Sequence, residues 1–194
     1  MKYNPISALI RTEKTVFSFA DICILWNETN LNNARVKINY YVKKGELISL
    51  RNGLYATHNN YNKYELANRI LRPSYISLET VLFDSGIIFQ KFDSVFLISY
   101  TSRELMVDGQ FYNYKKIKNE ILNNPLGINV SKYSVASPER AFLDTIYLNK
   151  DYYFDNLNPL NWEKVFSLSQ IYKKIRLERE IKKLYKTINY VKRN

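Results

Sequence analysis

The chain of 194 residues has little cysteine, histidine, glycine or proline. Its single cysteine, Cys23, excludes a disulfide framework and any zinc site built from several cysteines, which suits a reducing cytoplasm. Its single histidine, His58, lies in an Asn-rich stretch, where we expect an exposed loop residue rather than a base or a metal ligand. Five glycines and five prolines, with no tract rich in either, leave no sign of a flexible linker.

Long apolar runs are also absent. Nowhere do about 18 apolar residues occur together, and no signal-peptide core follows Met1-Lys2. We therefore expect a soluble cytoplasmic protein that neither spans nor binds a membrane. Because 46% of its residues are hydrophobic, the chain can bury real cores, and disorder is not expected to be its main state.

The net charge of +11 is unevenly distributed along the chain. Residues 1–60 carry 8 Lys/Arg and 4 Asp/Glu, residues 61–160 carry 11 and 11, and residues 161–194 carry 10 and 3. Two basic ends around a neutral middle indicate two regions that face polyanions. The abundance of Asn, Lys, Ile and Tyr also suits an AT-rich genome, which raises the lysine content for reasons unrelated to binding.

The N-terminal part begins with two short predicted helices. The first covers residues 5–13, with Pro5 in the first helical position. The second follows Ser18, which can cap the free backbone N–H groups, and Asp21 favours the positive end of its dipole. We expect this second helix to end near Asn27.

A third helix is predicted from Leu31 to Lys44. Asn30 is a suitable cap at its start, and Gly45 follows its end, where a left-handed backbone costs little. One stripe of about 100° forms the core side of this helix. That stripe holds Ala34, Ile38, Tyr41 and Val42.

A β-hairpin should follow, with strands over 46–50 and 54–57 and Asn52-Gly53 in its turn. Asn-Gly is a strong hairpin signal because both residues accept positive φ. Helix, helix, helix, strand, strand is the order of a winged helix-turn-helix, so we predict such a DNA-binding domain over residues 1–60.

Residues 61–194 are predicted to form a second domain, and the whole chain an α+β protein. The expected helices cover 62–72, 77–86 with Ser77 as cap, and 137–148, and the expected strands cover 94–101 and 110–117. A small sheet flanked by helices would result. After "NPLNWEKVF" we expect a long amphipathic helix to the C-terminus.

The outward side of the third helix is the predicted DNA-binding surface. In a helix-turn-helix this helix enters the major groove, where amides can pair with adenine edges, cations neutralise phosphates and apolar side chains contact thymine methyl groups. The hairpin tip can reach the backbone or the minor groove. The predicted DNA-binding residues are Asn32, Asn33, Arg35, Val36, Lys37, Asn39, Tyr40, Lys43, Lys44, Arg51 and Asn52.

Other interpretations of this surface stay open. The same residues would also make a solvated face with a stray hydrophobic patch, and a structural or adaptor protein would use the hairpin for protein contacts. Catalytic patterns are scarce, since Asp151 and Asp155 are explained by a loop or a helix start, and the "EIK" at 180–182 lies in a predicted helix. No Gly-rich phosphate loop occurs. We predict no enzyme activity, no metal and no cofactor.

The predicted terminal helix carries a continuous apolar seam and a basic remainder. The seam consists of Leu177, Ile181, Leu184, Ile188 and Val191. Docking on the parent domain is the favoured interpretation, with self-association or a partner helix as alternatives. The basic surface can add nonspecific phosphate contacts. A membrane-surface role is less favoured because the seam is narrow.

Five segments between about residues 10 and 165, in this order, carry a resemblance. They are "ARVKINYYVKKGELISLRNGLYA", "NKYELANRILRPSYISLETVLFDSGII", "NPLGI", "YSVASPERAFLDTIYL" and "DNLNPLNWE". Together they resemble the AbiEi family of antitoxins from type IV toxin-antitoxin systems. The resemblance implies a bacterial autorepressor that binds inverted repeats in its own promoter, and a C-terminal domain that counters a nucleotidyltransferase-like toxin.

The resemblance implies that the third predicted helix and the predicted hairpin carry out repression. It assigns this role to Asn32, Asn33, Arg35, Lys37, Asn39, Lys43 and Arg51. Inverted repeats require two copies on the DNA, so we expect a homodimer at least on the operator. Whether the toxin is bound directly is left open. The alternative is a stand-alone winged-helix regulator whose C-terminal domain dimerises or binds a ligand.

Overall fold

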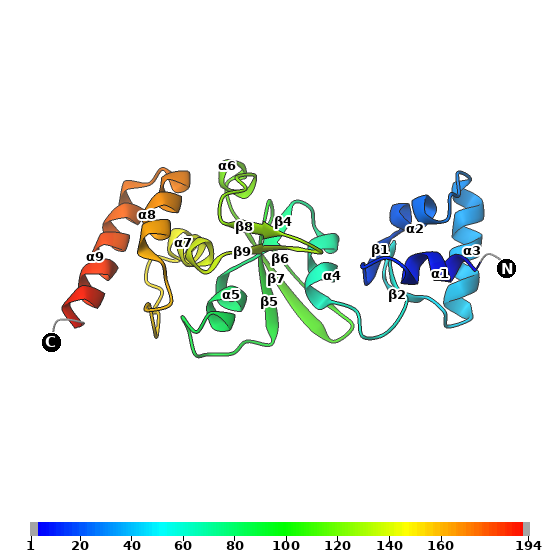
Figure 1. The fold of residues 1–194 in the computed structure, drawn as a ribbon, viewed down its shortest axis with the longest axis horizontal. Coiled ribbons are helices and arrows are strands. Elements are labelled where there is room, and N and C mark those ends of the chain that lie inside the picture. Colours follow the sequence, from blue (N-terminus) through cyan, green and yellow to red (C-terminus); the bar gives the residue numbers. More distant parts are fainter. Residues whose placement is uncertain (1–3, 192–194) are drawn as a thin grey trace. The chain divides into compact units, whose positions relative to one another are not determined.

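A computed structural model describes residues 4–191, with side chains described up to residue 187. It has the predicted α+β fold and divides into two compact units (Figure 1). The first unit comprises Met1–Ile70 and Val107–Gly109, and the second comprises Leu71–Met106 and Gln110–Asn194. The first unit thus extends past residue 60, where the sequence pattern changes, and a domain boundary at that residue stays a prediction.

The first unit contains short helices and a small sheet. Its elements are α1 (Pro5–Ile10), β1 (Val16–Ser18), α2 (Phe19–Leu25), α3 (Leu31–Lys43), β2 (Ile48–Arg51), β3 (Leu54–Ala56) and α4 (Lys63–Ile70). The predicted end of the first helix at residue 13 is wrong. Helix α1 stops at Ile10 because the Thr12 side chain turns back, and its hydroxyl donates a hydrogen bond of 2.8 Å to the Leu9 carbonyl.

The predicted helix caps at Ser18 and Asn30 are confirmed. Ser18 Oγ accepts from the Asp21 N–H at 3.1 Å, and Asp21 Oδ2 accepts from the Ser18 N–H at 2.9 Å, which completes a capping box. Asn30 Oδ1 accepts from the N–H groups of Asn32 and Asn33. These bonds satisfy donors that a helix start otherwise leaves free. Gly45 follows α3 with φ of 75°, as its position predicted.

The sheet of the first unit differs from the predicted hairpin in four respects. Strand β1, which was not predicted, pairs antiparallel with β3, so the strand order is β1-β3-β2. Strand β2 begins at Ile48 rather than residue 46, because the N–H groups of Glu46 and Leu47 bond back to the Tyr41 carbonyl. Of the turn pair, Gly53 alone has positive φ, and the register shifts between Ser49 and Arg51.

The core of the first unit lies where its helices meet the sheet. It consists of Ile6, Leu9, Phe17, Ile22, Trp26, Ile38 and Leu47. Trp26 satisfies its indole N–H by donating to the Pro5 carbonyl at 2.8 Å. The predicted core positions Ala34 and Ile38 of α3 are buried, and Tyr41 and Val42 pack against the same core. The core side of α3 is therefore confirmed, and its opposite side is left to solvent.

The second unit combines one mixed sheet with helices. Its elements are β4 (Ser74–Ile76), α5 (Leu78–Asp84), β5 (Ser94–Ser99), β6 (Arg103–Val107), β7 (Gln110–Lys116), α6 (Asn119–Leu122), β8 (Ile128–Val130), β9 (Ser134–Ala136), α7 (Pro138–Leu148), α8 (Trp162–Ser169), the 3-10 helix η1 (Gln170–Tyr172) and α9 (Ile175–Val191). The strand order is β6-β7-β5-β4-β9-β8, with β5 parallel to β7 and β4 antiparallel to β5.

Two predictions about the helices of the second unit need correction. Ser77 precedes α5 but does not cap it, because its hydroxyl donates to Asp144 instead. The segment after residue 166 is not one long helix: α8 ends at Ser169, η1 follows, and α9 begins at Ile175 after Lys173, which adopts φ of 47°. Helix α7 begins after Ser137 and ends at Leu148, as predicted.

The apolar seam of α9 docks on its own unit. Leu177 and Ile181 are buried, Leu184 is half-buried, and α9 contacts α7 and α8. Docking is therefore confirmed for this part of the seam, whereas the side chains of Ile188 and Val191 lie outside the described residues. No helix in the described part of the chain is both long and apolar enough to cross a membrane.

Candidate functional site

The outward surface of α3 collects most of the predicted DNA-binding residues. Ala34 and Ile38 of α3 lie in the core. All the predicted DNA-binding residues on this helix, and Lys44 directly after it, are exposed. On the hairpin of the same unit, Asn52 is exposed and Arg51 is half-buried. We call the exposed side chains of α3 and Lys44 the α3 surface. It carries amides, cations and no carboxylate of its own.

Two large apolar side chains interrupt the polar α3 surface. Val36 is 70% exposed and Tyr40 is 57% exposed. The Tyr40 ring contacts Tyr41 edge-on at 5.2 Å between centroids, and the Lys44 ammonium lies 5.8 Å from the Tyr40 centroid. Ile24 on α2 and Leu31 at the start of α3 are exposed as well, and sequence reasoning did not select either. Exposed apolar side chains beside amides are suited to contacts with base edges and methyl groups.

Four of the cations near this surface fall into two groups. Lys37 is paired with Glu28 of the α2–α3 turn, and Lys44 is paired with Glu46 at 2.6 Å. The hydrogen bond from Lys37 holds the pKa of Glu28 below its ordinary value. Lys43 and Arg51, in contrast, have no ion-pair partner among the described residues. They can neutralise a phosphate without first breaking a contact.

Arg35 is oriented by its neighbours within the first unit. Its Nη1 donates to Asn32 Oδ1 at 3.2 Å, and its guanidinium lies 5.5 Å from the centre of the Phe19 ring. These contacts restrict the side chain, although it stays exposed. An arginine held this way presents its remaining donors in a fixed plane, which is the geometry for two-point recognition of phosphate or guanine.

Four residues that the sequence did not assign to a site are Cys23, His58, Asp151 and Asp155, and the structure shows where each lies. Cys23 is buried in α2, and burial raises the pKa of its thiol. His58 is exposed in the segment after β3, as predicted. Asp151 and Asp155 both lie in exposed irregular segments, and Asp155 accepts a hydrogen bond from the Phe89 N–H at 2.8 Å. Across the described residues, no three His, Cys, Asp or Glu side chains meet as a metal site would require.

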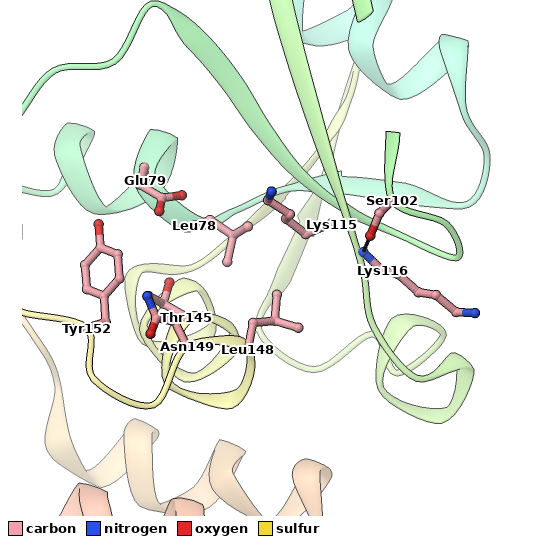
Figure 2. A pocket seen from close by; sticks show the side chains of 9 residues that line it. All are labelled: Leu78, Glu79, Ser102, Lys115, Lys116, Thr145, Leu148, Asn149 and Tyr152. Carbon is pink, nitrogen blue, oxygen red and sulfur yellow. Dashed lines mark hydrogen bonds between the residues drawn. The ribbon is translucent and has the colours of Figure 1, made fainter. Parts of the chain in front are cut away.

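The second unit contains a pocket of about 430 Å³ that sequence reasoning missed (Figure 2). Its lining comes from α5, the β5–β6 turn, β7, α7 and the segment after α7. The lining residues are Leu78, Glu79, Ser102, Lys115, Lys116, Thr145, Leu148, Asn149 and Tyr152. No local pattern marks these residues, because they are distant in the sequence and meet only through the packing of α5 and α7 beside the sheet.

A fully enclosed polar network lies elsewhere in the second unit. Arg140 and Asp144 are completely buried, with Arg140 Nε 3.5 Å from Asp144 Oδ1. Asp144 also accepts hydrogen bonds from the hydroxyls of Tyr172 at 2.6 Å and Ser77 at 2.9 Å. Burial, reinforced by the negative charge of Asp144, raises the pKa of Tyr172 well above its ordinary value. With no opening to solvent at these side chains, the network joins elements rather than receiving a substrate.

The chain is thus an α+β protein with an exposed amide- and cation-bearing helix in one unit and a lined pocket in the other. No family model matches it, and no curated protein matches it significantly.

Proposed function

We propose that the protein binds double-stranded DNA through the α3 surface and the β2–β3 hairpin, and that it represses its own operon. The observation that carries this proposal is the composition of the α3 surface, which exposes amides, cations, Val36 and Tyr40 on one rigid helix. The order α1-β1-α2-α3-β2-β3, with strands arranged β1-β3-β2, supports a winged helix-turn-helix.

In this proposal α3 lies in the major groove. The amides of Asn32, Asn33 and Asn39 meet adenine edges or phosphates, and Val36 contacts a thymine methyl group. Lys43 and Arg51 neutralise phosphates directly. Lys37 does so after leaving Glu28, an exchange that costs little because exposed ion pairs contribute only about 0–1 kcal/mol.

The test of specificity compares two duplexes of equal length and base composition. One is the DNA directly upstream of the gene for this protein, and the other is the same sequence shuffled. Fluorescence anisotropy near physiological salt should give an affinity for the upstream DNA about a thousandfold higher, since specific sites typically exceed nonspecific DNA by at least that factor. Equal affinities for both duplexes would rule out the repressor.

We further propose that the second unit counters a nucleotidyltransferase-like toxin. The support for this is the resemblance to AbiEi antitoxins, of which three segments, "NPLGI", "YSVASPERAFLDTIYL" and "DNLNPLNWE", fall entirely in this unit. Co-expression with the product of the adjacent gene tests it. Rescue of growth from a toxic nucleotidyltransferase-like neighbour is the expected result, whereas an unrelated neighbour without rescue leaves a stand-alone regulator.

A further inference from the structure

The pocket of the second unit is lined on one side by Glu79, and one oxygen of its carboxylate lacks a hydrogen bond from any described residue. Glu79 Oε2 is buried and has no hydrogen-bond partner within the residues that the structure describes. Burial raises the pKa of this carboxyl group above its ordinary value, and Lys115 partly opposes the rise. A buried carboxylate oxygen without a donor is costly, so such an atom in a native pocket calls for a ligand donor.

Tyr152 lies beside Glu79 on the same side of the pocket (Figure 2). Burial and the negative charges of Glu79 and Asp155 raise the pKa of its hydroxyl to about 12. The hydroxyl therefore stays protonated and can donate to one oxygen of Glu79, which leaves Oε2 for a second donor. This arrangement favours a ligand that brings N–H or ammonium groups.

The pocket also has a cationic side. Lys115 on β7 is paired with Glu104 at 3.9 Å, and their side chains are 45% and 73% exposed, so this pair is weak and Lys115 can turn to a ligand. Lys116 is the next residue of the strand, and its side chain extends away from Glu79 and Tyr152 in Figure 2. One cation thus faces one carboxylate across the pocket.

The rest of the pocket lining is partly apolar and partly polar. Leu78 and Leu148 supply apolar surface, and the Asn149 amide supplies a donor and an acceptor. Leu78 also has φ of 55°, a conformation that is uncommon for leucine and that tends to occur at functional positions. This left-handed residue begins α5 directly before Glu79, so the strained backbone and the unpaired carboxylate oxygen are adjacent.

We propose that this pocket binds a small zwitterion, namely a free α-amino acid with an apolar side chain. The ammonium group bonds to Glu79 Oε2, the carboxylate faces Lys115, and the side chain contacts Leu78 and Leu148. A volume of about 430 Å³ is at the small end of ligand pockets, which suits a metabolite of this size. A nucleotide is a poorer match, because its phosphate would meet Glu79 with only Lys115 in opposition.

Isothermal titration of the full chain without DNA tests this proposal. The probes are leucine, methionine and phenylalanine, together with leucine methyl ester, which lacks the anion, and N-acetylleucine, which lacks the cation. At least one free amino acid should bind saturably, and each blocked leucine should bind about tenfold more weakly than leucine itself. Binding of AMP in preference to every amino acid, or no difference between leucine and its blocked forms, would overturn the proposal.

Variants distinguish binding in the pocket from general effects of charge or folding. Glu79→Gln and Lys115→Gln should each weaken leucine binding about tenfold, whereas the matched changes Glu120→Gln and Lys118→Gln, at exposed positions outside the lining, should not. In Glu79→Gln, leucine should bind no better than N-acetylleucine while N-acetylleucine keeps its wild-type affinity, a combination that loss of folding cannot produce. If a preference for leucine survives in Glu79→Gln, the ammonium site is wrongly assigned. None of these results depends on DNA binding.

Discussion

Arg140 and Asp144 lie one turn apart on α7, and each depends on the other for charge compensation. Arg140 donates to the carbonyls of Ile121 at 2.7 Å and Leu126 at 2.9 Å, so the pair also fixes the segment around α6. A buried ion pair adds little net stability, but removal of one partner leaves an uncompensated charge in the interior.

Asp144→Asn should therefore lower the free energy of unfolding by about 3–5 kcal/mol. The amide keeps the shape of the carboxylate but leaves the Arg140 charge unpaired. Urea unfolding followed by circular dichroism measures the change, with Asp151→Asn in an exposed segment as the control, expected within about 0.5 kcal/mol of wild type. Equal midpoints for the two variants would mean that the network does not hold the unit together.

Asp21 plays a similar part in the first unit. Burial alone would raise its pKa, but hydrogen bonds from Ser18 and Lys14 and the charge of Arg69 hold it well below the ordinary value. Arg69 Nη1 lies 2.6 Å from Asp21 Oδ2, and Arg69 also contacts buried Glu65. The stabilisation is thus greatest while Asp21 is ionised in both the folded and the unfolded chain.

A carboxylate with a lowered folded-state pKa stabilises the fold above its unfolded pKa of about 3.8, and this contribution is lost as the pH falls toward the folded value. Asp21→Asn should lower the melting temperature by a constant amount above about pH 5. The gap between the two proteins should then shrink progressively below pH 3.8. A gap that is independent of pH down to 2 would show that ionisation of Asp21 does not stabilise the unit.

Glu28 competes with DNA for Lys37 in the proposed interface. Glu28→Gln removes the partner and frees the ammonium, so affinity for DNA should rise, and the slope of log affinity against log salt should steepen by up to about 0.9. Anisotropy titrations at several salt concentrations measure both. Glu120→Gln, which makes the same charge change in the second unit, should leave the slope unaltered. A rise of equal size in both variants would point to net charge alone.

At the scale of elements, helices were predicted better than strands. The starts of α2, α3 and α7 could be read from Ser18, Asn30 and Ser137, because a cap is a local interaction. Strands β1, β4, β8 and β9 have three residues each, too few for an alternating pattern, and β6 was not predicted either. Strands β1, β4 and β9 depend on partners that are distant in the sequence, such as Val16 with Ala56, which no local pattern reveals. Strands β6 and β8 pair with the next strands along the chain, β7 and β9.

Helix α9 depends on its buried seam rather than on its own propensity. Leu177→Ala should lower the free energy of unfolding by about 2–5 kcal/mol, as is usual for a large side chain removed from a core. Lys182→Ala on the exposed side should change it by less than about 0.5 kcal/mol. Urea unfolding gives both values. A Leu177→Ala variant that keeps its stability but loses an oligomer in sedimentation would favour the self-association alternative instead.

At the scale of the whole molecule, the two candidate sites differ in how far the sequence reveals them. The α3 surface follows from the helical period of one segment, since burial of Ala34 and Ile38 determines which side chains face outward. The pocket draws on residues from Leu78 to Tyr152 in several elements. The packing of those elements depends on contacts between distant parts of the chain, so composition and periodicity did not predict the pocket.

The proposed binding of DNA by the α3 surface and the hairpin can be tested through the salt dependence of a double variant. Lys43→Gln with Arg51→Gln removes two cations of the proposed interface that have no ion-pair partner within the described residues. Affinity for the upstream duplex should fall, and the salt slope should decrease by about 1.8, or about 0.9 for each lost phosphate contact. Lys91→Gln with Lys150→Gln, an equal charge change in the second unit, should retain both. Unchanged affinity and slope in the first double variant would contradict the account.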